Sequence, residues 1–383
     1  MDRGRGKKEG PTLRVMVVGG GEGQVNAIRR ARELGLEVVV SDRDPNAPGK
    51  VLADHFVQAD TFDARATIEG ARRYRVDGVC TLGTDQPVLT VARTAAELGL
   101  PGPHSVQQAE QATNKRLMKA LFDRHGLPHS PYRLLDGRLD FSVLEGLHPP
   151  YVIKPVDSQG QRGVRFVRDR RELALHVEES LAFSRDGHVL VEEYYPGDEL
   201  TFSGWVRQGR VYPLTITDRR TFSQFPHIGI CYAHTFPSRH YHRYGGQILE
   251  ISRRTVEALG LREGPLYFQM LVGEHGPRIN EIACRIGGAY EDQFIPALTG
   301  VALNDLNFAL ALGLGGSGSE ARRRRESGEG SSEGRDPESP PWVDEADASL
   351  RLFSYPASGS LAVLLFFARA GRVQQLGSRE DLR

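Results

Sequence analysis

The stretch from residue 151 to residue 199 constrains the fold of this chain most, because it places a long polar loop between apolar runs. Tyr151-Val152-Ile153 is a short apolar run typical of a strand, and Lys154 follows it directly. The loop beyond it contains Ser158-Gln159-Gly160-Gln161-Arg162-Gly163, and an apolar run begins again at Val164. Glycines let backbone N–H groups approach an anion closely, and a lysine at a strand end adds a positive charge. A β-hairpin with a polar turn and a solvated lysine would have the same outline, but this loop is longer than a hairpin turn requires and indicates phosphate binding.

A second pattern in the same stretch combines a strand of buried type with several acidic residues. Val189-Leu190-Val191 leads into Glu192-Glu193-Tyr194-Tyr195-Pro196-Gly197-Asp198-Glu199. Together with Lys154 and the glycine loop, this segment resembles the ATP-grasp superfamily of ligases. The resemblance places Ser158, Gln159, Gly160 and Gln161 over the nucleotide phosphates. It also places Glu192, Glu193 and Tyr195 around the adenine, which backbone groups read, and Glu199 on the ribose hydroxyls. Exposed glutamates are otherwise usually solvated, which is the alternative interpretation of these side chains.

The composition of the chain restricts the class of protein. With 383 residues, the chain has room for two or three domains. Lysine plus arginine and aspartate plus glutamate are equal at 49 each, so no net charge favours nucleic acid or an acidic membrane surface. Cys80, Cys231 and Cys284 are scattered and odd in number, which indicates a reducing, cytoplasmic setting. No apolar run approaches the ~18 residues of a membrane span, and residues 1–12 form a polar, basic tail without the apolar core of a signal peptide.

The N-terminal part has the order strand, glycine turn, helix, strand and acidic residue. Leu13 to Val18 is a strand of buried type, Gly19-Gly20-Gly21 turns into a helix from Gln24 to Leu34, and the next strand ends at Asp42. This order is typical of a dinucleotide-binding fold. Because Gln24 stands where the third glycine of that fingerprint is expected, a nicotinamide site competes with a simple tight turn that needs its glycines for backbone reasons.

Strands and helices continue to alternate after Asp42, which predicts a mostly parallel sheet. The expected strands cover residues 57–60 and 78–82, and the expected helices cover residues 63–74 and 87–98. Ligands of such sheets lie beyond the carboxyl ends of the strands. Gly21, Asp42, Thr84 and Asp85 should therefore surround one crevice. There, Asp85 is either a substrate-binding side chain or the cap of the helix that begins at Pro87.

The breaker cluster Gly99-Leu100-Pro101-Gly102-Pro103 predicts a domain boundary. We expect a disordered tail at 1–12, one domain at 13–103, and a second domain at 104–383 that contains a disordered insertion at 315–347. Within the second domain the expected elements are a helix over 105–125, a hairpin over 206–217 with its turn at Gln208-Gly209, a helix over 249–259, strands over 265–272 and 277–282, a helix over 292–314, and final strands over 350–353 and 361–368. Residues 219–238 show little periodicity, which is more typical of a functional loop.

Two later segments resemble further ATP-grasp motifs. Lys115 in Ala112-Thr113-Asn114-Lys115 is similar to the first lysine of the family, and Lys154 is similar to the second. Asn280-Glu281-Ile282-Ala283-Cys284-Arg285 resembles the family pattern E-x-N-P-R, with alanine and cysteine at the asparagine and proline positions. The resemblance implies that Gln269 and Glu281 hold Mg²⁺. A short hairpin would place these two side by side and Asn280 on the opposite face.

Arg285 is the residue expected to act in catalysis, because a guanidinium fork can hold the γ-phosphate and the acyl-phosphate oxygens together. The alternative role is a buried ion pair. Cys284 has no neighbouring base in the sequence and is expected to be a small buried residue. By resemblance, His234 is a further nucleotide contact. His240 and His242 lack a third ligand at metal-binding spacing.

The resemblance covers residues 13 to about 312 and implies an α/β protein. A Rossmann-like parallel sheet domain would precede an ATP-grasp domain of two α+β subdomains. The implied activity is that of a cytoplasmic carboxylate–amine ligase, dependent on ATP and on Mg²⁺ or Mn²⁺, that forms an acyl phosphate on a small metabolite such as an amino acid. Its partners would be a small-molecule acid and amine, without nucleic acid or membrane, and a homodimer stays open. The alternatives are an enzyme that uses bicarbonate or formate with a purine-pathway amine, an NAD-dependent dehydrogenase, and a non-catalytic nucleotide sensor.

Overall fold

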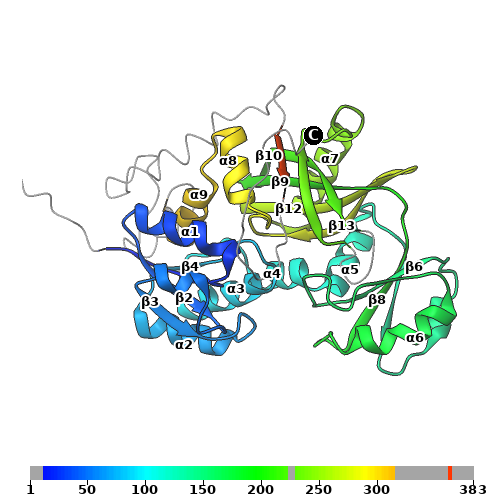
Figure 1. Cartoon of the computed structure of the whole chain (residues 1–383), viewed down its shortest axis with the longest axis horizontal. Helices are drawn as coiled ribbons and strands as arrows, with labels where there is room; N and C mark the ends of the chain where they lie inside the picture. The colour runs from blue at the N-terminus through cyan, green and yellow to red at the C-terminus, as the bar shows by residue number, and fades with distance from the viewer. Residues whose placement is uncertain (1–11, 223–228, 315–360, 365–383) are drawn as a thin grey trace, which may run out of the picture.

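The structure is a computed structural model that describes residues 12–222, 229–314 and 361–364. Three sheets and the helices that cover them make up the described part of the chain (Figure 1). The fold is therefore of the mixed α/β class, as predicted. The expected tail (apart from residue 12), the expected insertion at 315–347 and the expected strand at 350–353 lie outside the described residues.

The first sheet is parallel, as the alternation of strands and helices predicts. Its strands lie in the order β3-β2-β1-β4, with β1 at Arg14–Val18, β2 at Glu37–Asp42, β3 at His55–Gln58 and β4 at Gly78–Cys80. Helix α1 spans Glu22–Glu33, α2 spans Ala64–Tyr74, α3 spans Gln86–Leu98, and a 3₁₀ helix, η1, spans Pro48–Leu52. Strands β1 and β2, in the middle of the sheet, are short, valine-rich and mostly buried, which is typical of a parallel sheet with helices on both faces, whereas the edge strand β3 is only partly buried.

Alternate residues of β1 pack into two different cores. Val15 and Val17 lie in one cluster with residues of α1 and of α9 (Leu303–Ala311), whereas Met16 and Val18 lie in a second cluster with residues of α2 and α3. This alternation follows from the two-residue repeat of a strand. Because α9 belongs to the C-terminal part of the described chain, the first core ties the parallel sheet to that part.

The helix expected over residues 105–125 is in fact two helices, α4 at Val106–Thr113 and α5 at Lys115–His125. Asn114 separates them with an extended backbone (φ −112°, ψ 114°) and caps α5, because its side-chain oxygen accepts from the N–H groups of Arg116 and Leu117. Asparagine side chains compete with helical hydrogen bonds in this way. The break makes Lys115 the first residue of a helix, and its N–H donates to the Val156 carbonyl at 2.7 Å.

The second sheet is antiparallel and contains the stretch that begins at Tyr151. Its order is β5-β8-β6-β7, with β5 at Tyr132–Asp136, β8 at His188–Glu193, β6 at Tyr151–Pro155 and β7 at Arg165–Val167. Helix α6 spans Arg170–Leu181, and the 3₁₀ helix η2 spans Phe141–Leu144. Strands β6 and β7 pair antiparallel, so the glycine loop is the long connection of a hairpin. The hairpin outline and a loop suited to phosphate are thus compatible.

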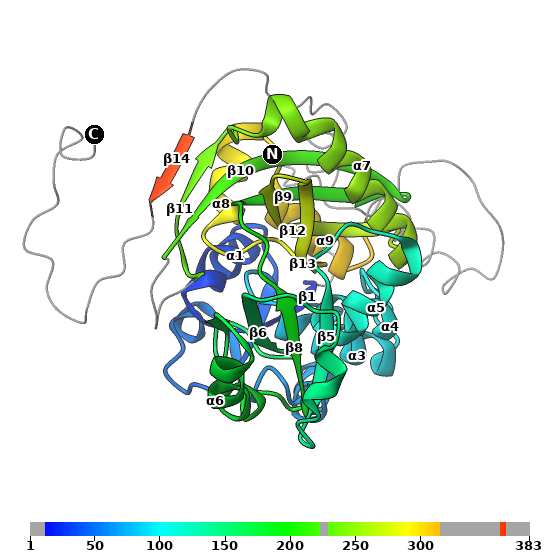
Figure 2. The same cartoon turned by 90° about the vertical axis from the view of Figure 1, so that its right-hand side faces the viewer.

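The third sheet has the order β13-β12-β9-β10-β11-β14 and is the largest of the three. Its strands are β9 at Asp198–Arg207, β10 at Arg210–Thr221, β11 at Cys231–Phe236, β12 at Glu263–Gly273, β13 at Gly276–Ala283 and β14 at Leu361–Leu364. The predicted turn at Gln208-Gly209 is confirmed, and both residues have positive φ (52° and 78°) as tight hairpin turns require. Figure 2 shows β14 at the sheet edge, paired with β11.

The prediction of an irregular loop over residues 219–238 is wrong for residues 219–221 and 231–236, which lie in strands. Strand β10 continues to Thr221, and β11 covers Cys231–Phe236. The two strands pair antiparallel, with a register shift at Arg220/Thr221. The sequence analysis did not identify these strands, because their phenylalanine, histidine and arginine residues do not alternate regularly between apolar and polar. Which of these side chains are buried depends on the position of each strand in the sheet. Helix α7 follows at Tyr241–Leu259 with Gly260 as its C-cap, so the helix expected over residues 249–259 ends where predicted but begins earlier, at Tyr241.

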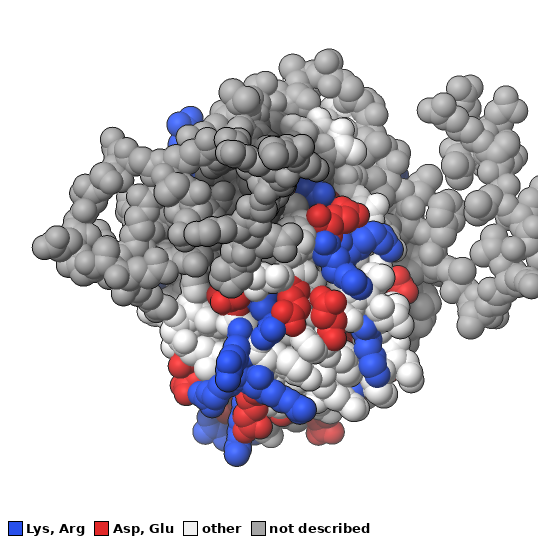
Figure 3. All heavy atoms as spheres, turned by 90° about the vertical axis from the view of Figure 1, so that its left-hand side faces the viewer, with Lys and Arg blue, Asp and Glu red and all other residues white. Residues whose placement is uncertain are grey.

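The helix expected over residues 292–314 is also two helices, α8 at Glu291–Thr299 and α9, which meet at 114°. Gly300 follows α8 with φ 71°, the left-handed conformation that commonly ends a helix. Within the described residues, no single helix has the length and apolarity to cross a membrane; α8 and α9 meet that test only when they are joined across their bend. On the face of the molecule in Figure 3, basic and acidic side chains are interspersed.

Candidate functional site

Three lysines and two glutamates meet where α5, β6, β8 and β13 come together. Lys154 Nζ lies 2.6 Å from Glu192 Oε2, and Lys119 pairs with the other oxygen of that carboxylate. Lys115 Nζ lies 3.3 Å from Glu281 Oε1. The three lysines and Glu192 are buried. When all five groups are ionised, the cluster has one positive charge in excess, which suits it to an anion such as a phosphate.

The pKa values of this cluster follow from burial set against opposite charges. Burial alone would raise the pKa of Glu192, but the attraction of Lys119 and Lys154 outweighs it and lowers that pKa to about 2. Burial opposes ionisation of Glu281 too, and the nearby Lys115 and Lys154 lower its pKa nevertheless. For Lys119 burial prevails and lowers the pKa, whereas for Lys154 the neighbouring carboxylates prevail and raise it.

Gln269 and Glu281 are direct partners on β12 and β13, so the prediction that a short hairpin sets them side by side is confirmed. The prediction that Asn280 faces away from them is wrong. A β-bulge shifts the register beside Gln269 and leaves Asn280 as the extra residue of β13. The side-chain oxygen of Asn280 accepts a hydrogen bond from Lys154 Nζ at 2.6 Å. A bulge re-aims a side chain, which simple alternation along a strand cannot anticipate.

The glycine loop contacts both the lysine cluster and the parallel sheet. The carbonyl oxygen of Ser158 accepts from Lys115 Nζ at 3.2 Å. When the amide group of Gln159 is assigned so that its oxygen faces these donors, that oxygen accepts from the backbone N–H of Asp85 at 3.0 Å and from that of Gln86. These two N–H groups lie at the N-terminus of α3. The loop therefore connects the lysines to the carboxyl edge of the parallel sheet.

Gly160 and Gln161, at the tip of the same loop, both adopt left-handed backbone conformations (φ 64° and 61°). A Cβ atom added to Gly160 would meet nothing within 4 Å, so this part of the loop borders open space. Gln161 packs against Gly229, where a Cβ atom would lie 2.9 Å from the Gln161 side chain. The loop tip is thus close to the start of β11.

The acidic segment at the end of β8 uses its side chains to hold neighbouring loops. Glu193 Oε1 accepts from the His148 backbone N–H at 2.8 Å and lies 3.0 Å from the His148 ring. The Tyr195 hydroxyl donates to the Gly276 carbonyl at 2.9 Å and accepts from the His275 N–H at 3.0 Å. With these side chains engaged, a base at this segment would meet mainly backbone groups.

Glu199 is held by Arg219, a residue that the sequence analysis left in an irregular loop. Arg219 Nη1 donates to Glu199 Oε2 and to Gln269 Oε1, each at 3.0 Å. Thr221 donates to the other oxygen of Glu199 at 3.0 Å. No sequence signal identified Arg219, because the pairing of β10 with β9 brings it here. Lys119 was also missed, although its position four residues after Lys115 on one helix was a usable signal.

Arg285 is paired with Asp85. Its Nε donates to Asp85 Oδ1 at 2.7 Å, Nη2 lies 2.6 Å from the same oxygen, and Nη1 donates to the Ile286 carbonyl at 3.2 Å. The guanidinium also lies over the Tyr267 ring, 4.4 Å from its centroid. Asp85 makes no side-chain cap on α3, so that interpretation of Asp85 is wrong. The ion pair considered as the alternative for Arg285 is present, and it joins the parallel sheet to the end of β13.

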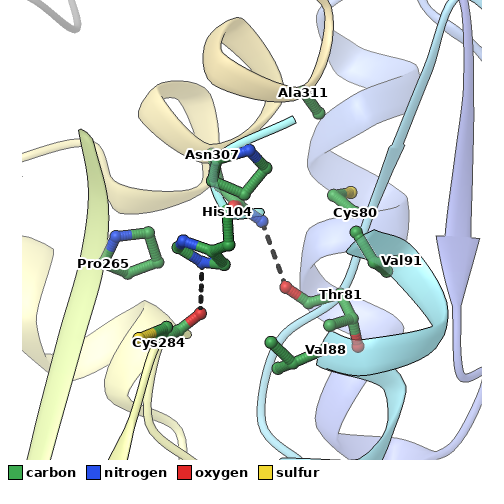
Figure 4. Close-up of a pocket in the computed structure, with 10 residues that line it drawn as sticks. Cys80, Thr81, Val88, Val91, His104, Pro265, Cys284, Asn307 and Ala311 are labelled. Carbon is green, nitrogen blue, oxygen red and sulfur yellow. Dashed lines mark hydrogen bonds between the residues drawn. The ribbon is translucent and has the colours of Figure 1, made fainter. Parts of the chain in front are cut away.

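Cys284 precedes Arg285 and lines the pocket drawn in Figure 4. Burial raises the pKa of its thiol to about 12, so the prediction of a small buried residue, rather than a nucleophile, is confirmed. His104 Nε2 lies 2.8 Å from the Cys284 carbonyl oxygen, and burial lowers the pKa of His104 to about 4. A neutral His104 ring therefore donates to this carbonyl and fixes the backbone beside Arg285.

Glu291 is a second acidic group near Arg285, at the start of α8. Its Oε1 accepts from the Ser203 hydroxyl at 2.9 Å, and its Oε2 accepts from the Gly287 N–H at 3.0 Å. Burial raises the pKa of Glu291 to about 7, against the opposing effects of Ser203 and Arg285. A Cβ atom on Gly287 would overlap the Glu291 carboxyl, so this position requires glycine.

His234 and His240 both have protein partners. His234 Nδ1 lies 3.0 Å from the Thr217 hydroxyl, and its Nε2 lies 3.4 Å from Cys231 Sγ. Burial lowers the pKa of His234 to about 4, so its ring is neutral. His240 Nε2 lies 2.8 Å from Asp198 Oδ2. Contact between His234 and a nucleotide stays a prediction.

Comparison with known proteins places both parts of the chain in one family. The ATP-grasp N-terminal domain matches residues 28–102, and the ATP-grasp domain matches residues 147–292. The phosphoribosylamine–glycine ligase of Thermococcus kodakarensis is 27% identical over 309 residues, which cover 75% of this chain and 70% of that protein.

Solved structures agree with this assignment at the level of the fold. The L-amino acid ligase of Bacillus licheniformis has a TM-score of 0.67 at 22% identity, over 81% of this chain and 76% of that one. The biotin carboxylase domain of the Hydrogenobacter thermophilus 2-oxoglutarate carboxylase, a dimer in complex with MgADP, ADP and bicarbonate, has a TM-score of 0.65 at 21% identity, over 78% of this chain and 69% of that one. With both domains matched in chain order, this chain belongs to the ATP-grasp superfamily of carboxylate–amine ligases.

Proposed function

We propose that this protein uses ATP and Mg²⁺ to convert a carboxylate into an acyl phosphate, which an amine then attacks. The observation that carries this proposal is a row of side chains on one face of β12. Gln269, beside Glu281, donates from its amide nitrogen to the Tyr267 hydroxyl at 3.3 Å, and Arg285 lies over the Tyr267 ring. The lysine cluster at one end of this row suits the phosphates, and Arg285 at the other end suits the carboxylate.

Each end of the row would do a different part of the chemistry. Lys115 and Lys154 would hold phosphate oxygens as point charges. A carboxylate oxygen of the substrate attacks the γ-phosphorus, and ADP leaves. Arg285 then faces the charge that develops on the transferring group, where a fixed guanidinium lowers the barrier. In the second step the amine nitrogen attacks the acyl carbon, inorganic phosphate leaves with the electrons of the C–O bond, and the amine loses a proton.

The donors around Gln269 and Glu281 fit Mg²⁺. This ion is usually bound through one or two carboxylates together with waters and substrate phosphates. Glu281 offers the carboxylate, of which Oε1 is paired with Lys115, and Gln269 on the neighbouring strand offers a side-chain amide oxygen that also accepts from Arg219. Among the described residues there is no group of three or more His, Cys, Asp or Glu side chains that could hold a metal alone, so nucleotide phosphates would have to complete the shell. The ion would neutralise phosphate charge, and Mn²⁺ prefers the same oxygen ligands.

Two measurements test this function. Calorimetry should show binding of ATP with Mg²⁺ and none of NADH. Release of ADP and phosphate should then depend on particular amino acids, tried singly and in pairs. ATP binding without ADP release under any of these conditions would support a nucleotide sensor instead. Binding of NADH in place of ATP would support a dehydrogenase.

The glycine turn of the parallel sheet favours the ligase over the dehydrogenase. Gln24, at the place of the third glycine, donates to the Leu82 carbonyl at 2.7 Å and lies against Gly19. Asp42 accepts from the Gly20 N–H at 2.7 Å, so the carboxylate that would hold a ribose is already engaged.

A second candidate function uses bicarbonate or formate with a purine-pathway amine. The similarity to a formate-dependent phosphoribosylglycinamide formyltransferase of Burkholderia lata favours it, as does the bicarbonate in the related carboxylase structure. ADP release that depends on bicarbonate or formate, and not on amino acids, would select it. We also propose that the protein acts in the cytoplasm on free small molecules, without nucleic acid or a membrane. Light scattering would show whether it is a homodimer, as in the related carboxylase domain.

A further inference from the structure

The Asp85 carboxylate has one engaged oxygen and one open oxygen. Both contacts from Arg285 go to Oδ1. Among the described residues, Oδ2 of Asp85 has no hydrogen-bond partner. The Asp85 side chain is 26% exposed, whereas that of Arg285 is 6% exposed. The accessible side of the ion pair is therefore the negative one.

The fold frees Asp85 for this position. An aspartate just before a helix usually turns back to accept from the first helical N–H groups. Here Gln159 of the glycine loop accepts from the N–H groups of Asp85 and Gln86 instead, and Asp85 makes no cap. The side chain that would ordinarily cap α3 is directed to Arg285.

The proximity of Asp85 restricts what carboxylate Arg285 can accept. A substrate carboxylate on the Arg285 guanidinium would lie close to the Asp85 carboxylate, and two like charges at that range disfavour each other. A positive group on the substrate, next to its own carboxylate, would remove the repulsion and pair with Asp85 Oδ2.

We propose that the acid activated by this protein is an α-amino acid bound as a zwitterion, with its carboxylate on Arg285 and its α-ammonium group on Asp85. The inference rests on the proposed acyl-phosphate function and narrows its substrate class. In an α-amino acid the ammonium group is on the carbon that carries the carboxylate, so one small molecule can meet both members of the ion pair. An ammonium group held by Asp85 has no free electron pair, so a second molecule supplies the attacking amine.

Hydroxylamine provides a test that does not require the natural amine to be known. It attacks acyl phosphates and yields hydroxamates, which are measured by their iron complexes. The full-length protein with MgATP and hydroxylamine is assayed against the proteinogenic amino acids and against the matched carboxylic acids that lack the α-amino group. The wild-type protein should form hydroxamate from one or more amino acids and at least tenfold less from the matched acids.

Variants then assign this preference to Asp85. Asp85→Asn should lower kcat/KM for the preferred amino acid at least tenfold, with little change for the matched acid, so that the preference collapses. Asp85→Glu, which keeps the charge, should retain part of it. Glu110→Gln is the matched control, because Glu110 is in an ion pair with Arg93 at 3.1 Å, outside the site, and its loss should leave the preference unchanged. Melting temperature and ATP affinity are measured for every variant to confirm folding.

The outcomes separate this inference from the function on which it rests. Equal hydroxamate yields from amino acids and matched acids would overturn the zwitterion assignment while the ligase function stands. An undiminished preference in folded Asp85→Asn would overturn the role of Asp85. Absence of hydroxamate from every amino acid, with yield from bicarbonate, formate or another acid, would overturn the inference alone. Absence from all acids would overturn the proposed function as well.

Discussion

Replacing Arg285 with lysine tests the proposed chemistry most directly. Lysine keeps the positive charge but offers one nitrogen where the guanidinium offers three. The native side chain uses Nε and Nη2 on Asp85 and Nη1 on the Ile286 carbonyl, while its flat face covers Tyr267. A lysine cannot keep these contacts and also face a transferring phosphoryl group. We therefore expect Arg285→Lys to bind ATP normally and to turn over very slowly.

The size of the effect follows from the contacts that are lost. Removing one preorganised donor from a developing negative charge costs about 2.7–4 kcal/mol in the transition state. At about 1.4 kcal/mol per factor of ten, kcat should fall on the order of 10²-fold to 10³-fold. The loss should appear mainly in kcat, because the Arg285 guanidinium acts on charge that develops during the reaction. Losing the donor to the buried Ile286 carbonyl should also lower the free energy of unfolding by about 1–3 kcal/mol.

The assay is ADP release with saturating amino acid and MgATP, together with calorimetric ATP affinity. Arg30→Lys is the matched control, because Arg30 makes a two-point ion pair with Asp305 at 2.7 and 2.8 Å, outside the site. This control should lose some stability and keep its turnover. If Arg285→Lys turns over at the wild-type rate, Arg285 is a structural ion-pair residue and the acyl-phosphate mechanism loses its main support.

Three further changes test other parts of the site. Lys154→Ala should weaken ATP binding several-fold or more, since a charge-assisted contact is worth ~1.5–3 kcal/mol, and unchanged affinity in calorimetry would remove Lys154 from the site. His104→Phe should lower the free energy of unfolding in urea by about 1–3 kcal/mol, because the buried Cys284 carbonyl loses its donor; unaltered stability would contradict this. Burial raises the pKa of Glu291 from 4.5 to about 7, so between those pH values the folded state keeps a proton that the unfolded state releases, and stability falls as pH rises. In Glu291→Gln, melting temperature should fall less steeply as pH rises. Equal slopes of melting temperature against pH in the variant and the wild-type protein would refute the raised pKa of Glu291.

Local patterns in the sequence were sufficient for the elements and for some neighbours within them. Alternating strands and helices predicted the parallel sheet, and the short hairpin of residues 265–272 and 277–282 predicted that Gln269 faces Glu281. The same patterns did not predict that Asn114 separates α4 from α5, although an asparagine that caps a helix is itself a local signal. Strand β10 was missed beyond residue 217, because its residues lack a clean apolar alternation and the sheet around them decides their burial.

By itself, then, the sequence determined the superfamily, the order of the secondary structure, and the lysines, glutamates and arginine that carry the expected chemistry. Only the tertiary structure decided which of these side chains meet. The bulge that turns Asn280 toward Lys154 depends on how β13 pairs with β12. The contact between Asp85 and Arg285 joins residues 200 positions apart. Periodicity reports the local backbone and the face on which a side chain lies, whereas a contact across the chain depends on how separate sheets and helices pack, which no local pattern encodes.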